Sequence, residues 1–278
     1  MADTTSFLPL LEEAFPGMGA TIVRCEKIGY PWNSTPFVKK QEGVAISHVG
    51  LLDYPMVIQG VLHNVGAIHA VSTKAAYRRQ GYASDLLQEA LHFAEKRYEC
   101  TILFTEIPAF YKKFSFRYLE EHRFHLPCKA SQGTKSLLPV SSPKDDPLFR
   151  HCFQNRAALS HLLWIKDQGT IASYNTLFAT YPMYWSLHYS PFFSGFLSYE
   201  IKNRELHLFD IIASKIPSLE VILDHLPAAI DVIYFYFSPD LLTDKATAQP
   251  YLYDHGHFLV HGNFPKLSPF MIPPLSRC

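Results

Sequence analysis

The chain has 278 residues, which is enough for one large domain or two small ones. Hydrophobic residues make up 48% of it and charged residues 18%, so a substantial core can form, and a formal net charge of +0 gives no overall attraction to nucleic acid. The start of the sequence lacks the basic residues and long apolar run of a signal peptide, and no apolar run is long enough to cross a bilayer. We therefore expect a cytoplasmic protein without a nucleic-acid or membrane partner.

The cysteines and histidines give no sign of a metal or a disulfide framework. The five cysteines are an odd number without C-x-x-C spacing, which agrees with a reducing compartment. The fourteen histidines form no pair with ligand spacing on a clear helix, so we expect no metal. The phosphate-binding sequence G-x-x-x-x-G-K-S/T of nucleotide hydrolases is absent.

The first part of the chain reads as a short helix followed by strands. We expect a helix over 6–15, ended by a Pro-Gly pair, and a loop over 30–36. Strands are expected over 37–40, 44–52, 56–61 and 65–72.

The stretch 65–91 is the most informative part of the sequence. A buried strand leads into a basic, glycine-containing turn, Arg78-Arg79-Gln80-Gly81, and then into a helix over 81–98 whose apolar positions recur with a period of 3.6. The first N–H groups of a helix have no partner within the helix and the dipole is positive there, so such a turn suits a phosphate. The residues alone also allow a plain helix start.

Further strands and helices are expected beyond this helix. They are a strand over 101–107, a short helix over 108–114 that begins with Pro, and an edge strand over 116–125. Residues 129–146 are rich in Lys, Ser, Pro and Gly and predict a linker. Helices over 147–166, 173–178 and 218–226 follow, with strands over 183–189, 195–202, 205–214, 231–238, 258–264 and 270–272.

Two motifs resemble those of the GNAT N-acetyltransferases. Arg78-x-x-Gly81-x-Ala83, preceded by a strand that ends in Ala70-Val71, resembles the coenzyme A signature of that family. The segment FYKKFSF, residues 110–116, resembles the family's fYkkfGF segment, with Ser115 in place of Gly. Serine fits that position if its φ stays negative. The resemblance implies an α/β protein with a mixed sheet, the GNAT acyl-CoA N-acyltransferase fold, and acetyl-CoA as co-substrate.

The second half repeats the order of strand, strand, helix and strand. Its turn reads Lys215-Ile216-Pro217, without glycine or an arginine cluster. We therefore expect a catalytic domain over 1–128, a linker over 129–146 and a degenerate GNAT-like domain over 147–278. This arrangement is similar to tandem GNAT proteins of the enhanced-intracellular-survival type, although their third domain has no room here.

The resemblance also implies site residues. The backbone of Ala70 and Val71 would bind pantetheine and the thioester carbonyl. The pyrophosphate would lie on the turn and the helix start, at Arg78, Arg79, Gln80, Gly81, Tyr82, Ala83 and Ser84. Tyr111 matches the general acid that protonates the departing thiolate. In the survival-type relatives the terminal carboxylate reaches the active site, and Cys278 holds that place here.

The general base and the acceptor site stay open at this stage. His69, on the same strand face as Ala67 and Val71, and Glu106, at the end of the next strand, are candidate bases. His48 is a third candidate base or an acceptor contact. Tyr30, Trp32 and Phe37 are candidates for the acceptor site. Each of these residues could equally be a packing or structural residue.

The resemblance predicts an enzyme that transfers an acetyl group to a primary amine by direct attack in a ternary complex. A small-molecule amine, an antibiotic amine and a protein lysine are all open as acceptor, and so are a longer acyl chain and a homo-oligomer. The alternative function is a non-catalytic acyl-CoA-binding sensor or scaffold.

Overall fold

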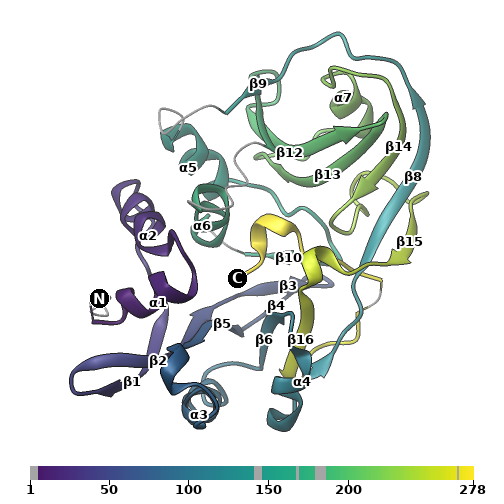
Figure 1. Cartoon of the computed structure of the whole chain (residues 1–278). Coiled ribbons are helices and arrows are strands. Elements are labelled where there is room, and N and C mark those ends of the chain that lie inside the picture. Colours follow the sequence, from purple (N-terminus) through teal and green to yellow (C-terminus); the bar gives the residue numbers. More distant parts are fainter. Residues whose placement is uncertain (1–5, 141–145, 167–168, 179–185, 268) are drawn as a thin grey trace.

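The computed structural model describes residues 6–140, 146–166, 169–178, 186–267 and 269–278. Within these residues the strands form two large sheets and one small one (Figure 1). The first sheet has six strands in the order β1 (Thr35–Gln41), β2 (Val44–Asp53), β5 (Val65–Thr73), β6 (Cys100–Thr105), β16 (His257–Gly262) and β7 (Arg117–Tyr118). The second sheet has seven in the order β15 (Thr247–Pro250), β8 (His122–Ala130), β14 (Ile230–Phe235), β13 (Glu205–Ile212), β12 (Gly195–Lys202), β11 (Leu187–Ser190) and β9 (Leu138–Pro139).

The small sheet and the helices pack around these two sheets. The small sheet has the order β10 (Leu163–Ile165), β3 (Met56–Ile58) and β4 (Val61–His63). The helices are α1 (Leu8–Ala14), α2 (Met18–Lys27), α3 (Tyr82–Ala94), α4 (Pro108–Tyr111), α5 (Asp146–Gln154), α6 (Thr170–Leu177) and α7 (Leu219–Leu223).

Helix α3 covers one face of the first sheet. Its apolar stripe, Leu86, Leu87, Ala90, Leu91 and Ala94, is buried against the side chains of β1, β2, β5 and β6 that point to this face. The opposite face packs against the small sheet and the C-terminal segment. The two faces of β5 therefore meet different parts of the molecule, which matters for the site below.

The second half repeats the topology of the first. β12 and β13 form the expected antiparallel hairpin, and α7 leads to β14, which runs parallel to β13. A register shift marks β13, where Phe209 is an extra residue opposite β12. Directly after this residue, Asp210 forms a buried ion pair with Arg156. The second half thus has a similar strand order but carries a buried ion pair beside its bulge.

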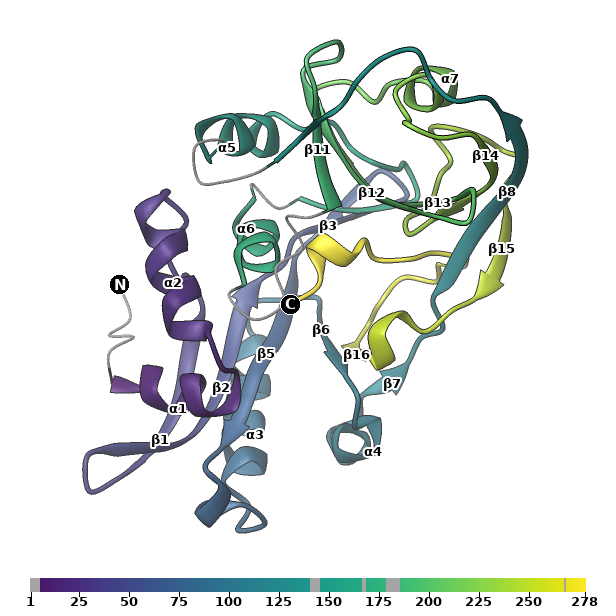
Figure 2. The same ribbon diagram turned by 45° about the horizontal axis from the view of Figure 1, so that its top comes forward.

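The C-terminal part of the chain returns to the first sheet. β16 pairs antiparallel with β6 along its whole length and with β7 on its other side. The last residues then run between the two sheets, as both views of the ribbon show (Figures 1 and 2). They are held there by buried side chains such as Phe270, Ile272 and Leu275 and by a hydrogen bond from the Tyr54 hydroxyl to the Ser276 carbonyl.

The sheets do not follow the expected division of the chain. β8 crosses residue 128 and belongs to the second sheet, while β16, from the expected second domain, lies in the first. The expected linker over 129–146 contains the end of β8 and β9, and residues 141–145 lie outside the described residues. The expected domain boundary is wrong because β16 pairs with β6, far away in the sequence, and no local sequence pattern predicts such a pairing.

Four expected elements are wrong in type or extent. The strand expected over 56–61 is a hairpin of β3 and β4 with a turn at 59–60. The helix expected over 147–166 ends at Gln154, because Arg156 turns in to Asp210 and the Ser160 hydroxyl donates to Asp240, and the chain then forms β10. Residues 270–272 are buried but form no strand. The edge strand over 116–125 is split into β7 and β8, which belong to different sheets. Of the strand over 183–189, residues 183–185 lie outside the described residues.

Candidate active site

The site is built where two parallel strands of the first sheet separate. β5 and β6 pair only through Val65–Ala67 and Cys100–Ile102, and then diverge. At the same point β5 carries an extra residue opposite β2, where Ala70 has a φ of +49°. A bulge of this kind bends a strand and interrupts its ladder. The backbone of β5 beyond Ala67 therefore faces an open wedge instead of a neighbouring strand.

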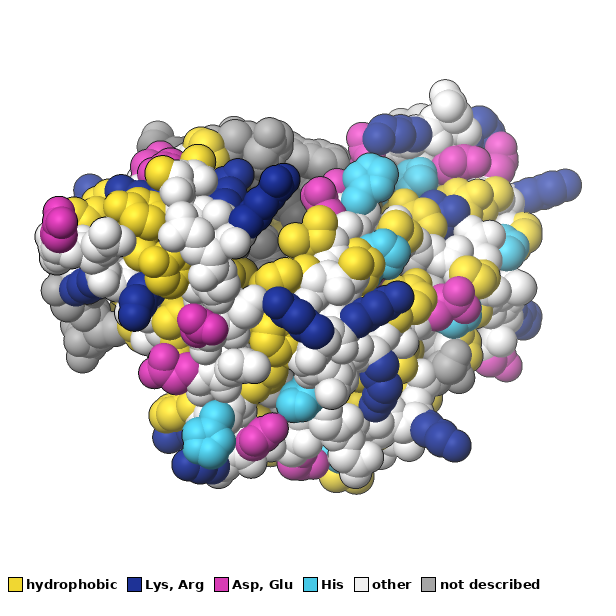
Figure 3. Space-filling model, turned by 60° about the horizontal axis from the view of Figure 1, so that its bottom comes forward, with side chains coloured by type: hydrophobic (Ala, Val, Ile, Leu, Met, Phe, Trp, Pro, Cys, Tyr) yellow, Lys and Arg dark blue, Asp and Glu magenta, His cyan; other side chains and the backbone are white. Residues whose placement is uncertain are grey.

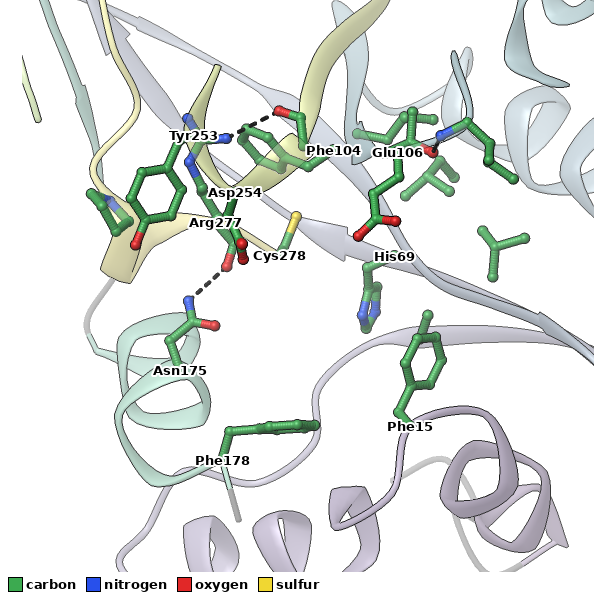
Figure 4. A pocket seen from close by; sticks show the side chains of 18 of the residues that line it. Phe15, His69, Phe104, Glu106, Asn175, Phe178, Tyr253, Asp254, Arg277 and Cys278 are labelled. Carbon is green, nitrogen blue, oxygen red and sulfur yellow. Dashed lines mark hydrogen bonds between the residues drawn. The ribbon is translucent and has the colours of Figure 1, made fainter. Parts of the chain in front are cut away.

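A cavity of about 1000 Å³ occupies this wedge. It is bounded by β5, the end of β6, the start of α2, the end of α6 and the C-terminal segment (Figure 4). Its lining residues are Phe15, Met18, Ile68, His69, Ala70, Val71, Leu103, Phe104, Thr105, Glu106, Ile107, Tyr111, Asn175, Phe178, Tyr253, Asp254, Gly256, Pro274, Arg277 and Cys278. The three expected catalytic residues and the expected pantetheine residues are therefore brought together in one cavity.

Tyr111 lies on the last turn of α4 and is 6% exposed. Burial raises the pKa of its phenol to about 12, and a hydrogen bond with the Thr105 side chain offsets this in part. Its ring packs edge-on against Phe110 and Phe116. The Tyr111 phenol is thus packed at the cavity wall and protonated at neutral pH.

Two histidines with different surroundings flank the bulge. His69 lines the cavity, and burial, followed by the nearby His48, lowers the pKa of its imidazole to about 3. His48 is fully buried, stacks on Phe7 at 4.8 Å and donates from Nδ1 to the carbonyl of Ala70 at 2.9 Å. Burial lowers its pKa to about 4, although the hydrogen bond to Ala70 acts in the opposite direction. Both imidazoles are neutral at physiological pH.

Carboxylates and the C-terminal segment form the remaining walls. Figure 4 shows Glu106, His69 and Cys278 around the same space, with the rings of Phe15 and Phe178 opposite them. The Glu106 carboxylate is exposed to this space from the end of β6. Asn175 donates to the carbonyl of Arg277 at 2.7 Å, which fixes the C-terminal segment beside α6. Cys278 therefore lies at the cavity, where the resemblance placed it.

The expected phosphate turn lies at the start of α3. Gly81 is the N-cap with a φ of +90°, and the space around its Cα is open. Among the described residues, the backbone N–H groups of residues 79–83 donate to no backbone carbonyl, whereas that of Ser84 donates to Gly81. Arg78 donates from Nε to the carbonyl of Thr73, which anchors the turn to the end of β5. The free donors are thus those of residues 79–83.

Lys113 is a cation at this turn that sequence reasoning missed. Its Nζ lies 2.7 Å from the Ser84 hydroxyl, and it also stands over the rings of Phe110 and Phe114, 5.0 Å from each centroid. Figure 3 views the face that carries α3 and α4, where several Lys and Arg side chains stand out. The signal in the sequence was the double lysine of the FYKKFSF segment, whose second member reaches the turn across the fold.

The four expected acceptor residues are not brought together. Trp32 lines a smaller cavity of about 140 Å³ that shares His69, Phe178 and Cys278 with the large one. Tyr30 is buried against α5 and α6, and Phe37 is buried under α3. His48 lies below the bulge. These three residues line neither cavity.

Two details of the expected backbone are wrong. Ser115 has a φ of +61°, not a negative one, because the chain must reverse between the turn that follows α4 and the next strand. Val71 packs toward the α3 face, whereas Ala67 belongs to the opposite cluster, because the extra residue at Ala70 reverses the alternation.

The described residues contain no group of three or more His, Cys, Asp or Glu side chains placed as metal ligands would be. No helix among them is both long and apolar enough to cross a membrane.

Comparison with known proteins assigns the first part of the chain to a family. Residues 2–119 match the family model described as acetyltransferase (GNAT) domain. No curated protein matches the chain by sequence. Solved structures with a similar fold include a probable N-acyltransferase from Enterococcus faecalis, with a TM-score of 0.59 and 14% identity over 94% of this chain and 70% of that one.

Two further structures resemble the chain to a lesser degree. A GCN5-related N-acetyltransferase from Anabaena variabilis has a TM-score of 0.53 and 16% identity, over 91% of this chain and 68% of its own. Eis1 from Mycobacterium abscessus has a TM-score of 0.50 and 15% identity, over 80% of this chain and 62% of its own. At these identities the likeness concerns the fold, and it confirms the expected mixed α/β architecture over most of the chain. Residues 2–119 of this protein are therefore a domain of the GNAT acetyltransferase family.

Proposed function

We propose that this protein transfers an acetyl group from acetyl-CoA to a primary amine by direct attack in a ternary complex. The observation that carries the proposal is the separation of β5 from β6. It leaves the edge of β5 at Ile68–Val71 without a strand partner on the β6 side, in the same cavity as Tyr111, with the phosphate turn beyond the end of the same strand. Pantetheine would extend β5 by backbone hydrogen bonds, and the pyrophosphate would lie on the N–H groups of residues 79–83.

In the proposed reaction the amine nitrogen attacks the thioester carbonyl carbon. A C–N bond forms, the C–S bond breaks, and the amine loses one proton while the thiolate gains one. Burial raises the pKa of Tyr111 to about 12, so its phenol is protonated at neutral pH and is the proposed donor to the thiolate. A thiol, with a pKa of about 8.5, is a stronger acid than this phenol, so the proton moves to sulfur only after the C–S bond has begun to break. Until then the phenol stabilises the negative charge that develops on sulfur by donating a hydrogen bond to it.

Glu106 is the proposed acceptor of the amine proton. Burial lowers the pKa of His69 to about 3, which makes its imidazole a weaker base than an unperturbed one. The Glu106 carboxylate is exposed to the cavity and can receive the proton through water. The acceptor would enter on the face opposite α3, near Phe15, Phe178 and Trp32, because the coenzyme phosphates occupy the α3 side.

A thermal-shift measurement with acetyl-CoA and with free adenosine tests the coenzyme site. A ligand that binds only the native state raises the midpoint of unfolding. We expect a shift with acetyl-CoA in the wild type that is lost in Gly81→Glu. Gly43→Glu is the matched control, because Gly43 also has a φ near +80° and open space around it but lies in the β1–β2 hairpin. Absence of a shift in the wild type at saturating acetyl-CoA would refute the proposal.

Turnover is tested with a panel of primary amines and detection of free thiol. If the protein binds acetyl-CoA but acetylates no class of amine, including protein lysines, the result supports the non-catalytic sensor and contradicts the enzyme.

A further inference from the structure

One wall of the large cavity is the corner between α1 and α2, residues 15–18. Phe15 and Met18 line the cavity and are only partly buried, so this wall presents apolar surface to it. Both side chains pack in one cluster with the buried residues of α1 and with Ala70, the bulge residue of β5. The α1–α2 corner therefore lies against the part of β5 that is proposed to hold the thioester.

The carboxylate of Glu12 holds the α1–α2 corner in place. Its two oxygens accept hydrogen bonds from the backbone N–H groups of Gly17, at 2.8 Å, and Gly19, at 2.7 Å. The bond from Gly17, followed by that from Gly19, lowers the pKa of the Glu12 carboxyl. The N–H of Met18 also donates to the carbonyl of Phe15 at 3.0 Å. The apolar wall is thus formed without a ligand, which reduces the entropy lost when a ligand binds to it.

Charge distinguishes two sides of the same cavity. Among the described residues, the charged side chains that line it are Glu106, Asp254 and Arg277. The guanidinium of Arg277 is held in its ion pair with Glu121, so these lining residues leave no free cation for a carboxylate of the acceptor. In Figure 4 the ring of Phe15 lies on the same side as Glu106, whereas Asp254 lies on the other side. An amine at Glu106 therefore meets apolar surface, and the second carboxylate lies across the cavity.

We propose that the acceptor is an apolar primary amine, with one amino group on a hydrocarbon or aromatic body and no second charge, and that this body lies against Phe15 and Met18. The inference rests on the proposed function and narrows it. The amino group lies near Glu106, which accepts its proton, and burial of the body supplies the binding free energy. Glu12 lines neither cavity and is a positioning residue that acts through the α1–α2 corner.

The first test compares three primary amines of similar basicity on the wild type, with detection of free thiol. n-Hexylamine differs from ethylamine in chain length and from 1,6-diaminohexane in the charge at the far end. We expect kcat/KM for n-hexylamine to exceed that for ethylamine by roughly 10-fold to 100-fold, because further methylene groups are buried. The diamine should be clearly poorer than n-hexylamine, because its second ammonium would have to leave water. A higher kcat/KM for the diamine or for a lysine-containing peptide than for n-hexylamine overturns the inference.

The second test follows a selectivity ratio, kcat/KM for n-hexylamine divided by kcat/KM for ethylamine, which is independent of the fraction of folded enzyme. Phe15→Ala should lower this ratio by roughly 5-fold and leave KM for acetyl-CoA unchanged. Phe15→Leu keeps an apolar side chain and should retain most of the ratio. Phe192→Ala is the matched control, because this phenylalanine is 68% exposed and lines neither cavity. An unchanged ratio in Phe15→Ala overturns the inference.

The positioning role of Glu12 is tested with the same ratio. Glu12→Ala should lower it, because the N–H groups of Gly17 and Gly19 lose their acceptor. In a Phe15→Ala background the same change should have no further effect, since the wall that Glu12 positions is already lost. Glu13→Ala is the control at the adjacent, exposed carboxylate and should leave the ratio unchanged. Equal effects of Glu12→Ala in both backgrounds would refute its positioning role.

The outcomes separate this inference from the proposed function. If acetyl-CoA gives no thermal shift and no amine is acetylated, the proposed function fails and the acceptor class fails with it. If the wild type acetylates the diamine or peptide lysines better than n-hexylamine, the proposed function stands and the apolar acceptor is refuted.

Discussion

Both carboxylate oxygens of Glu121 lie 2.7 Å from Nη2 of Arg277, in an ion pair whose side chains are 3% and 11% exposed. Glu121 also accepts the backbone N–H of Ile272 at 3.0 Å. The pair joins the segment between the two sheets to the C-terminal residues that line the cavity. The guanidinium stands over Phe104 and Tyr253 at the cavity wall. One carboxylate thus fixes both the crossing of the chain and one side of the site.

Glu121→Gln should lower the free energy of unfolding by about 3 kcal/mol, since it leaves the buried charge of Arg277 without its partner. Denaturant titration measures this change. Lys202→Ala is the control, because it breaks the exposed pair with Glu200 and should cost less than about 1 kcal/mol. Equal effects of the two substitutions would mean that Glu121 has no special part in joining the sheets.

Tyr111→Phe should lower kcat by about 10²-fold, because the thiolate then leaves without a proton donor. The acetyl-CoA thermal shift should stay as in the wild type. Tyr118→Phe provides the comparison, since Tyr118 is an exposed phenol on β7 that does not line the cavity. An unchanged kcat in Tyr111→Phe would assign the proton donor to another group.

Lys113→Ala should raise KM for acetyl-CoA several-fold, because it removes the cation that lies against Ser84 at the start of α3. The effect should shrink at high salt, as screening weakens the attraction to phosphate. The adjacent, exposed Lys112 is the control, and Lys112→Ala should change KM little. If the two variants behave alike, the contact with Ser84 has no bearing on coenzyme binding.

Ser115→Gly should raise the free energy of unfolding by about 0.5 to 1 kcal/mol. Serine at a φ of +61° carries the strain of the left-handed region, which glycine lacks, and this gain exceeds the extra freedom of glycine in the unfolded chain. Ser131→Gly is the matched change at an exposed residue without a positive φ, and it should destabilise the protein slightly. Thermal and urea unfolding measure both.

Stability should fall on acidification partly because of His48. Its pKa is about 4 in the folded protein and about 6.5 in the unfolded chain, so the unfolded state binds the proton more tightly between these values. Its contribution is complete above pH 6.5 and is lost as the pH falls toward 4, at up to about 1.4 kcal/mol per pH unit. His48→Gln should flatten the dependence of the unfolding free energy on pH in that window. Parallel curves for the two proteins would contradict the buried, neutral state of His48.

The local part of the site was predictable from the sequence. The strand, turn and helix from Val65 to Ala94 form as expected, because apolar periodicity and a glycine N-cap act over short distances. Tyr111, Glu106 and His69 share one cavity because His69 lies where β5 leaves β6, Glu106 directly follows β6, and Tyr111 lies on the helix that comes next. These relationships follow from chain order alone.

The remaining walls of the site could not be read from local patterns. Phe178 and Cys278 reach the cavity from segments far along the chain, and no periodicity or turn signal links them to β5. The φ of Ala70 was equally hidden, since alanine gives no sign of a bulge.

The insertion of β16 between β6 and β7 also constrains how the protein can be made. When residues 2–119 have emerged from the ribosome, the segment that matches the family model is complete. The edge of β6 that pairs with β16 is still unpaired, and the cavity lacks the residues that its C-terminal segment contributes. Until β16 emerges, that apolar edge is open to pairing with another nascent chain. Coenzyme binding should therefore begin only late in translation, and a fragment cut after residue 119 should aggregate instead of binding coenzyme.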